Sequence, residues 1–305
     1  MTASSTLRTG MIGLGSMGAG MARCLLAAGH ALTVYARRPE SAQAAADAGA
    51  VIAPTPAALG AQCEIVFLSL PDATAVQAVL FGPDGLASGL QPGSTVVDTS
   101  TIAATQARSI GGRLAAQGIT YLDAPVSGGQ AGAQAGTLGC MVGGPAAAVD
   151  AVRGVMGAFC KTITHMGALG AGQTVKACNQ VATAGAMLGV ADALALARAQ
   201  GVDAAMVRDV LLGGAARSFA LEKHAPRIAA GEFQPGFRAR LMRKDLRLAL
   251  DTARATQAVL PGAELAEALL HDLCESGRAD WDWCALALQV QRRGGMTVPD
   301  TPGGS

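Results

Sequence analysis

The chain has 305 residues and a formal net charge of +1; half of its residues are hydrophobic and 15% are charged. This composition excludes a disordered chain and leaves room for two domains, each with its own core. The small net charge gives no electrostatic reason to expect nucleic acid or an anionic membrane as a partner.

Seven cysteines are spread along the chain without a CxxC pair. This pattern argues against a disulfide framework and against a zinc site, so we expect reduced thiols and no bound metal. The first residues contain no apolar run of the kind that signal peptides have. Together these features predict a cytoplasmic protein.

Short apolar runs alternate with helix-length segments through the first half of the chain. Strands are predicted at 8–12, 31–35, 64–68, 95–98, 120–123 and 139–142. Predicted helices between them include 16–28, 39–48, 74–80 and 105–116. This alternation is typical of an α/β domain, in which crossover helices connect the strands of a parallel sheet.

From about residue 166 onward the pattern becomes purely helical. Residues 173–200 contain no proline and predict a single helix, roughly 40 Å long at 1.5 Å per residue. Further helices are predicted at 204–212, 241–256, 263–276 and 284–293. We therefore expect an α/β domain at 1–165, an all-α domain at 166–293 and a disordered tail at 294–305.

A glycine-rich turn follows the first predicted strand. Gly13, Gly15 and Gly18 have GxGxxG spacing, and a helix and a second strand follow, as a βαβ unit requires. Such a turn lets a pyrophosphate approach the backbone at the helix N-terminus, although a merely tight turn would have the same spacing. The residues expected to bind a dinucleotide here are Gly13, Leu14, Gly15, Ser16, Met17 and Gly18.

The end of the second predicted strand indicates which dinucleotide is bound. An acidic residue usually contacts the ribose of NAD(H) there, but this chain has Ala36 followed by Arg37 and Arg38. Guanidinium groups can hold the 2′-phosphate of NADP(H) by charge-assisted hydrogen bonds. We therefore expect NADP(H) in preference to NAD(H). The alternative is that both arginines are solvated and that Glu40 reaches the ribose.

Lysine is rare in this chain, which makes Lys176 conspicuous at the start of an apolar helix. Burial disfavours the ammonium form, so a lysine there can give up a proton, which an arginine cannot do. Asn179 and Gln180 follow by three and four residues and share its helix face. An acid beside amides suits the protonation of a carbonyl oxygen during hydride transfer. The alternative for an isolated lysine is a surface position, in which the aliphatic part of the side chain packs on the protein and the ammonium group is solvated.

Ser127, Gly128 and Gly129 offer a hydroxyl and successive backbone N–H groups. Such a nest can hold a substrate carboxylate, although an ordinary turn has the same composition.

Four segments in order resemble the β-hydroxyacid dehydrogenase family, over residues 8 to about 293. They are the GLGSMG turn, the segment DAPVSGGQAGAQAGTLGCMVGG from Asp123, GAGQTVKACNQ from Gly170 and RLMRKDLRLAL from Arg240. The family includes 3-hydroxyisobutyrate dehydrogenase, tartronate semialdehyde reductase and the glyoxylate/succinic semialdehyde reductases. The resemblance implies a Rossmann-like N-terminal domain, an all-α C-terminal domain built on a long interdomain helix, and a cleft between them.

The resemblance also assigns roles to individual residues. It implies that Lys176 is catalytic with support from Asn179, and that Ser127, Gly128, Gly129 and Gln180 bind the substrate. Leu70, Pro71 and Thr101 would line the cofactor groove, and Lys244 beside Asp245 would close over the nicotinamide end. The alternative for Lys244 and Asp245 is a solvated helix face. Phe237 and Trp283 are candidates for the wall of the substrate pocket, although such residues more often belong to a core.

The sequence therefore predicts an NADP(H)-dependent oxidoreductase that interconverts a small β-hydroxyacid and its semialdehyde or oxo acid. The expected substrate is of the tartronate semialdehyde, glyoxylate/succinic semialdehyde or 3-hydroxyisobutyrate type. Imine reductases related to this family usually carry Asp or Tyr in place of the lysine, and a non-catalytic dinucleotide-binding protein would have lost it. A homodimer or homotetramer is expected, since twofold assemblies are the commonest soluble oligomers.

Overall fold

The computed structural model describes residues 7–295. The chain forms two compact units, Met1–Lys176 and Ala177–Ser305. The division falls within one helix, α8 (Ala171–Ala199), which contributes its first turns to the first unit and the remainder to the second. Of the tail predicted at 294–305, residues 296–305 lie outside the described part of the chain.

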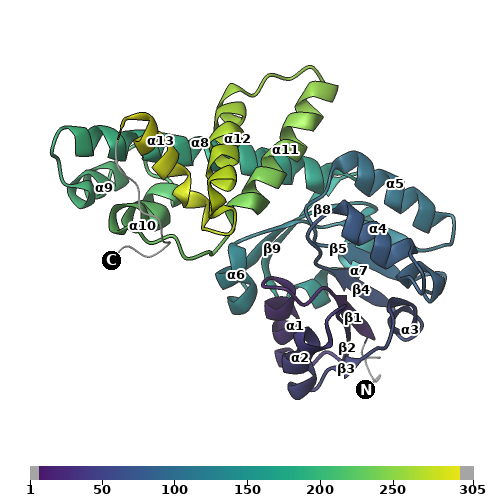
Figure 1. Ribbon diagram of the computed structural model, residues 1–305. Coiled ribbons are helices and arrows are strands. Elements are labelled where there is room, and N and C mark those ends of the chain that lie inside the picture. The colour runs from purple at the N-terminus through teal and green to yellow at the C-terminus, as the bar shows by residue number, and fades with distance from the viewer. Residues whose placement is uncertain (1–6, 296–305) are drawn as a thin grey trace. The chain divides into compact units, whose positions relative to one another are not determined.

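The first unit is built on a nine-stranded mixed sheet with helices on both faces (Figure 1). The strand order is β3-β2-β1-β4-β5-β6-β8-β7, and β9 also pairs with β8. The strands from β3 to β6 are parallel, whereas β8 runs antiparallel to β6 and β7. The first six positions follow the doubly wound order of dinucleotide-binding domains, which confirms the Rossmann-like fold.

All six predicted strands are present, within one or two residues of their expected bounds. They are β1 (Thr9–Ile12), β2 (Leu32–Tyr35), β4 (Ile65–Leu68), β5 (Thr95–Asp98), β6 (Thr120–Asp123) and β8 (Leu138–Gly143). Three strands were not predicted: β3 (Val51–Ile52), β7 (Val126–Ser127) and β9 (Cys160–Gly167). Two of these are only two residues long, and β9 is largely exposed, so none has the apolar run that identifies a buried strand.

Two hydrophobic cores cover the two faces of the sheet. Met21 and Leu25 of α1 and Val152 of α7 pack on one face, and Leu59 of α3, Val76 of α4 and Ile110 of α5 lie in the core of the other. The helices are α1 (Gly18–Ala27), α2 (Gln43–Asp47), α3 (Pro56–Gly60), α4 (Ala73–Phe81), α5 (Ala104–Ala115), α6 (Gly129–Ala135) and α7 (Ala146–Met156), with short 3₁₀ turns η1 (Pro39–Ala42) and η2 (Leu86–Ser88).

The second unit is all-α, as predicted. After α8 it contains α9 (Ala204–Leu212), η3 (Ala220–His224), α10 (Ala225–Ala230), α11 (Ala239–Ala255), α12 (Pro261–Leu273), η4 (Cys274–Arg278), η5 (Trp283–Ala285) and α13 (Leu286–Arg293). Its core combines Met187 and Leu194 of α8 with Leu246 of α11, Leu270 of α12 and Leu286 of α13. The long helix therefore forms one wall of this core.

By length and composition alone, α8 is also long and apolar enough to cross a membrane, with 44% of its most apolar window buried inside the molecule. A core helix passes the same test. Its buried positions Ala184, Met187, Ala191 and Leu194 all lie in the helical core, whereas Leu196 is 66% exposed.

Two carboxylates are buried where β5 and β6 end. Asp98 and Asp123 are register partners, and both side chains are inaccessible to solvent. Burial raises the pKa of Asp98 to about 6, against hydrogen bonds from Ser100 and Tyr121 that favour the carboxylate. Tyr121 donates its hydroxyl to Asp98 Oδ2 at 2.6 Å, and the Ser100 N–H donates to Oδ1 at 2.9 Å.

The raised pKa of Asp98 predicts a particular pH dependence of stability. Between the ordinary pKa of 3.8 and about 6 the folded state holds this proton more tightly than the unfolded state, so stability falls as pH rises through this window. A shift of this size corresponds to about 3 kcal/mol. Asp98→Asn removes this titration. Between pH 4 and pH 7, we expect urea unfolding to show the wild type losing up to about 3 kcal/mol relative to this variant, because the other titrating groups are common to both proteins. Equal pH dependence of the two proteins would contradict this prediction.

Candidate active site

The carboxyl ends of the parallel strands meet at one edge of the sheet. The register pairs Ile12 with both Tyr35 and Leu68, Leu68 with Asp98, and Asp98 with Asp123. The segments that follow these residues therefore start at the same level of the sheet. In doubly wound sheets, ligands bind outside this edge, where the strand order reverses. Here the reversal lies between β1 and β4.

The glycine turn between β1 and α1 fits a dinucleotide. Gly13 has φ +94°, and a Cβ there would lie 2.3 Å from the Ser69 carbonyl oxygen; one at Gly18 would lie 1.8 Å from the Gly13 carbonyl oxygen. At Gly15, by contrast, a Cβ would meet no atom within 4 Å. The first and third glycines thus close the turn, while the second faces open space from which a pyrophosphate can approach the backbone. No side chain caps the N-terminus of α1, so no side-chain cap competes with an anion there.

The other residues of this turn differ in what they can offer. Ser16 is exposed, but the side chain of Leu14 is buried and Met17 packs against the core. Leu14 and Met17 can therefore contribute only backbone groups to a cofactor, whereas Ser16 can also contribute its hydroxyl.

Arg37 and Arg38 lie just beyond β2, next to this turn. The Gly13 N–H donates to the Tyr35 carbonyl oxygen at 3.4 Å, which ties the end of β2 to the turn. Both arginine side chains are exposed, and the Arg38–Glu40 ion pair is long at 3.9 Å. A pair this exposed contributes little, so both guanidinium groups are available to a phosphate.

The segments after β4 and β5 are joined to each other. The Thr99 hydroxyl donates to the Leu68 carbonyl oxygen at 2.6 Å, and the Leu70 N–H donates to the Ser100 hydroxyl at 2.9 Å. Leu70 also lies against Gly13. Pro71 is exposed and Thr101 is partly exposed at the same edge. These contacts bring Leu70, Pro71 and Thr101 to the edge that carries the glycine turn.

The predicted carboxylate nest leads from β7 into α6. Ser127 pairs with Gly139 in the sheet, and Gly128 and Gly129 have φ of +130° and +62°. The positive φ values are readily adopted only by glycine, and no side chain caps the start of α6 at Gly128.

Lys176 is held at this edge by the anchor of α8. Asp123 accepts hydrogen bonds from the N–H groups of Gly170 at 2.7 Å and Gln173 at 2.8 Å. The Gln173 side chain also bridges the Ile102 N–H and the Ser100 carbonyl oxygen. A Cβ on Gly172 would lie 2.4 Å from the Met141 carbonyl oxygen, so only glycine fits there. Lys176, one turn further along α8, is only 7% exposed.

In the second unit, Asn179 and Gln180 belong to a polar network with α11. The Asn179 Nδ2 donates to Gln180 Oε1 at 2.9 Å, and Gln180 Nε2 donates to Asp245 Oδ2 at 2.7 Å. The Lys244 ammonium forms an ion pair with Asp245 Oδ1 at 3.1 Å. Gln180 and Asp245 are buried, at 5% and 4% exposure. Asp245 is therefore not part of a solvated helix face.

Phe237 and Trp283 are arranged around a fourth buried carboxylate, that of Asp282. Trp283 belongs to the helical core, and Phe237 packs against that core. Asp282 accepts the N–H groups of Gly236 and Phe237 at 2.8 and 3.1 Å, and the Arg227 guanidinium lies 3.1 Å away. Burial by itself would raise the pKa of Asp282, but these donors and the Cys284 N–H lower it overall.

One group of potential metal ligands occurs in residues 7–295. His224, Asp282 and Cys284 have ligand atoms within 4.8 Å of one another. However, Arg227 and backbone N–H groups already engage the Asp282 carboxylate, and burial raises the pKa of the Cys284 thiol well above its usual value. The side chains of this group therefore fit a role in holding the adjoining loops better than the binding of a metal ion.

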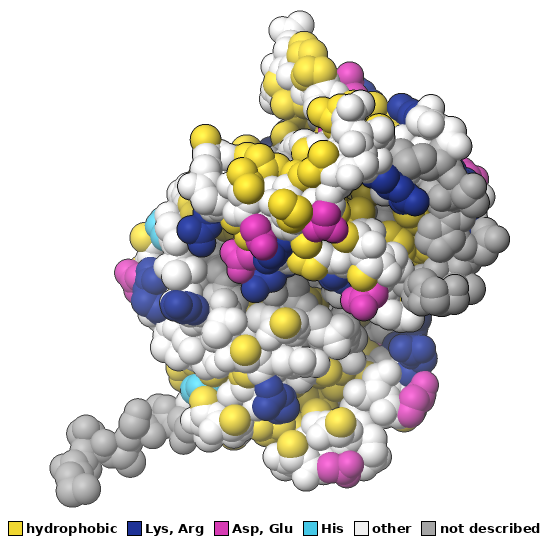
Figure 2. All heavy atoms as spheres, turned by 90° about the vertical axis from the view of Figure 1, so that its left-hand side faces the viewer, with side chains coloured by type: hydrophobic (Ala, Val, Ile, Leu, Met, Phe, Trp, Pro, Cys, Tyr) yellow, Lys and Arg dark blue, Asp and Glu magenta, His cyan; other side chains and the backbone are white. Residues whose placement is uncertain are grey.

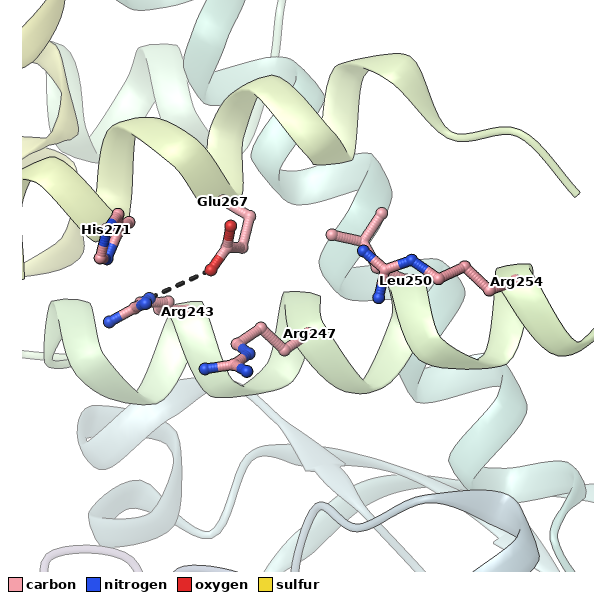
Figure 3. Close-up of a pocket in the computed structure, with 6 residues that line it drawn as sticks. All are labelled: Arg243, Arg247, Leu250, Arg254, Glu267 and His271. Atoms are coloured by element: carbon pink, nitrogen blue, oxygen red, sulfur yellow. Dashed lines mark hydrogen bonds and ion pairs between the residues drawn. The ribbon is translucent and has the colours of Figure 1, made fainter.

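A pocket of about 280 Å³ lies between α11 and α12 (Figure 3). Arg243 points to Glu267 at 3.1 Å and also lies 3.9 Å from Glu275, and Arg254 pairs with Asp251 at 2.7 Å. Carboxylates thus balance most of its basic residues, which fits an ion-pair network between two helices. Its lining is Arg243, Arg247, Leu250, Arg254, Glu267 and His271.

The groups that support the predicted site residues were not predicted from the sequence. Asp123, Gln173 and Ser100 hold α8 and the β4 and β5 ends together, and Asp282 organises the loop of Phe237. Asp123 stands at the end of a predicted strand, and this position was the only local signal of its importance. The partners of all four come from distant parts of the sequence.

Two family models match the chain, one after the other. Residues 8–167 match the NAD binding domain of 6-phosphogluconate dehydrogenase. Residues 170–290 match a model described as NAD-binding of NADP-dependent 3-hydroxyisobutyrate dehydrogenase.

Individual relatives extend over nearly the whole chain. The 2-hydroxy-3-oxopropionate reductase of Escherichia coli is 38% identical, over 93% of this chain and 97% of the relative. The NAD-dependent L-serine dehydrogenase of Pseudomonas aeruginosa is 39% identical, over 90% and 95%. Among solved structures, Mycobacterium tuberculosis 3-hydroxyisobutyrate dehydrogenase with L-serine superimposes with a TM-score of 0.87 at 32% identity, covering 94% of this chain and 99% of that one.

Proposed function

Since the chain belongs to the β-hydroxyacid dehydrogenase family and is an NAD(P)-dependent oxidoreductase of small hydroxyacids, we propose that it reduces a semialdehyde or oxo acid with NADPH, using Lys176 as the general acid. The observation that carries the proposal is a buried lysine one turn beyond the anchored start of α8, at the sheet edge that also carries the glycine turn. The substrate class is a small carboxylate of the tartronate semialdehyde, glyoxylate/succinic semialdehyde or 3-hydroxyisobutyrate type. The enzyme would act in the cytoplasm.

In this mechanism the residues of the chain bind the substrate and move one proton. The N–H groups and hydroxyl of Ser127, Gly128 and Gly129 hold the substrate carboxylate. Bound NADPH supplies the hydride to the carbonyl carbon. Lys176 Nζ donates a proton to the carbonyl oxygen as negative charge develops there, which completes the alcohol. In the reverse direction, neutral Lys176 accepts the proton of the substrate hydroxyl.

The supporting residues have distinct tasks in this proposal. Asn179 and Gln180 orient the substrate or the ammonium from the same helix as Lys176, and Phe237 forms part of the pocket wall. Lys244, with Leu70, Pro71 and Thr101, contacts the cofactor. Residues 13–18 hold its pyrophosphate. The fit of the glycine turn to a dinucleotide supports this part of the proposal.

Replacing Lys176 tests the proton-donor role. Lys176→Arg keeps the positive charge but cannot release a proton, and Lys176→Ala removes both properties. We expect kcat for reduction to fall about 10²- to 10⁴-fold in either variant, the usual contribution of a general acid. NADPH binding, followed by the fluorescence of the reduced nicotinamide, should remain. Lys161→Ala, at an exposed lysine of β9, is the matched control. Turnover near the wild-type rate in Lys176→Arg would exclude the mechanism.

The preference for NADP(H) rests on Arg37 and Arg38. Both are exposed beside the glycine turn, and Ala36 leaves no carboxylate directly after β2 to repel a phosphate. In the double variant Arg37→Ala/Arg38→Ala we expect the KM for NADPH to rise by at least about tenfold, since hydrogen bonds to charged groups contribute about 1.5–3 kcal/mol.

The KM for NADH serves as the internal control, because that cofactor lacks the 2′-phosphate. It should change less than threefold in the double variant, a rough allowance for altered surface charge. Glu40→Gln tests the opposite assignment. If wild-type rates with NADH equal or exceed those with NADPH, and Glu40→Gln weakens NADH binding, the arginines do not select the cofactor.

The second unit also supports the proposal of a homodimer or homotetramer. Helix α9 is strongly apolar yet has no buried residue, and Leu196, Met206, Val210 and Phe219 are 66–77% exposed. Figure 2, viewed from the side on which α9 lies in Figure 1, shows hydrophobic side chains at this surface. A second copy of the chain would cover them.

A charge on this surface should weaken the assembly. We expect Val210→Glu to shift the protein towards monomer in sedimentation velocity, because association would bury an unpaired carboxylate. Val259→Glu is the matched control, since Val259 is equally exposed but lies on the loop between α11 and α12. A wild-type protein that sediments only as monomer would refute the proposal.

A further inference from the structure

In the polar network of the second unit, each hydrogen bond has a fixed donor and a fixed acceptor. The Lys244 ammonium lies 3.1 Å from Asp245 Oδ1, and a carboxylate paired with a cation can only accept hydrogen bonds. Gln180 must therefore present its NH₂ group to Asp245, and the distance between Nε2 and Oδ2 is 2.7 Å. The same NH₂ group also faces the Met242 sulfur at 3.5 Å.

Gln180 in turn fixes the orientation of the Asn179 amide. Because the NH₂ group of Gln180 is committed to Asp245, its carbonyl oxygen Oε1 faces Asn179. Only a donor can meet that oxygen, and Asn179 Nδ2 does so at 2.9 Å. The acceptor Oδ1 is then the atom of the Asn179 amide that lies beyond the network. Amide orientations are usually ambiguous, but here a charged group at one end of the network determines both of them.

We propose that Asp245 is a positioning residue for the reaction: acting through Gln180, it makes Asn179 present a carbonyl oxygen rather than an NH₂ group to the donors at the reacting centre. This rests on the proposed function, in which Lys176 lies one turn before Asn179 on α8. An acceptor at that place can bind an ammonium group, which has only donors, whereas a second donor would oppose it. Asp245 itself touches neither substrate nor the reacting atoms in this proposal.

Asp245→Asn tests the direction without changing the size of the side chain. The Lys244 ammonium would hold the new amide oxygen, so the new NH₂ group would face Gln180. Gln180 would then turn its oxygen towards position 245, and Asn179 would present its NH₂ group outward. We expect kcat to fall about tenfold or more, as for the loss of a hydrogen bond to a charged group, with little change in the KM for the oxo acid.

The double variant Gln180→Glu/Asp245→Asn reverses the donor and acceptor at both positions and keeps the net charge. The carboxylate introduced at position 180 can accept from the amide introduced at position 245 and from Asn179 Nδ2, which restores the outward Oδ1. We expect kcat to rise at least about threefold above that of Asp245→Asn, without reaching the wild-type value, because Gln180 is also placed among the substrate-binding residues. Gln180→Glu alone would place a second carboxylate beside that of Asp245, and the two negative charges would repel each other. We expect the kcat of this variant to remain below that of the wild type.

Asp251→Asn is the matched control, because it removes an exposed carboxylate from the same helix. It should leave kcat unchanged. Thermal unfolding of every variant shows whether a loss of kcat is only a loss of structure. The proposal fails if Asp245→Asn, with melting unchanged, stays within threefold of the wild-type kcat, or if the double variant is no better than Asp245→Asn. Either result would leave the role of Lys176 intact if Lys176→Arg is inactive, so the two proposals fail separately.

Discussion

The carboxylate of Asp123 connects the sheet to the long helix, and the arrangement of the candidate site depends on this contact. One oxygen accepts the Gly170 N–H and the other accepts the Gln173 N–H, so the start of α8 is held at the end of β6. Burial raises the pKa of Asp123, and these backbone hydrogen bonds oppose that shift. Together with the Gln173 side chain, which bridges Ile102 and Ser100, this anchor fixes the start of the helix that carries Lys176 relative to the sheet.

The same contact explains the glycines that precede Lys176. A side chain on Gly172 would collide with the Met141 carbonyl oxygen and with Asp123, and Gly170 has φ +93°. The small residues of this segment thus allow a close approach between backbone and carboxylate. That approach brings Lys176, whose side chain is almost fully buried, to the edge where the parallel strands end. A lysine can exchange a proton, which the arginines found elsewhere in the chain cannot do.

Each unit contains its own set of buried polar residues that supports residues of the proposed mechanism. In the first unit, Asp98, Ser100 and Gln173 join the ends of β4 and β5 to α8. In the second unit, Asp245 orders the amides of Gln180 and Asn179. Each set begins at a buried carboxylate, because an ionised carboxylate accepts several hydrogen bonds and thereby orients its donors. The helical core and the two sheet cores bury these carboxylates, and each carboxylate orients the hydrogen-bond donors around it.

Much of the fold could be predicted because it rests on local patterns. The six strands predicted from short runs of four or five residues are all present in the structure, and α9 was predicted with its observed bounds. The strands β3, β7 and β9 were missed because they are very short or largely exposed, and so lack an apolar run. Of the candidate site, the glycine turn was predicted from its spacing between a strand and a helix, and the roles of Lys176 and the amides were predicted from the family resemblance. The partners that hold them could not be predicted.

The sequence by itself determined the α/β and all-α units, the class of cofactor and the candidate proton donor, because each depends on residue types at short, regular spacing. Only the tertiary structure decided that Asp123 anchors α8 across some fifty residues of chain, and that Asp245 bonds to Gln180 rather than to solvent. The residues next to a carboxylate in the sequence do not indicate its hydrogen-bond partner. Its role is set by which distant N–H groups the packing of strands and helices brings within hydrogen-bonding distance.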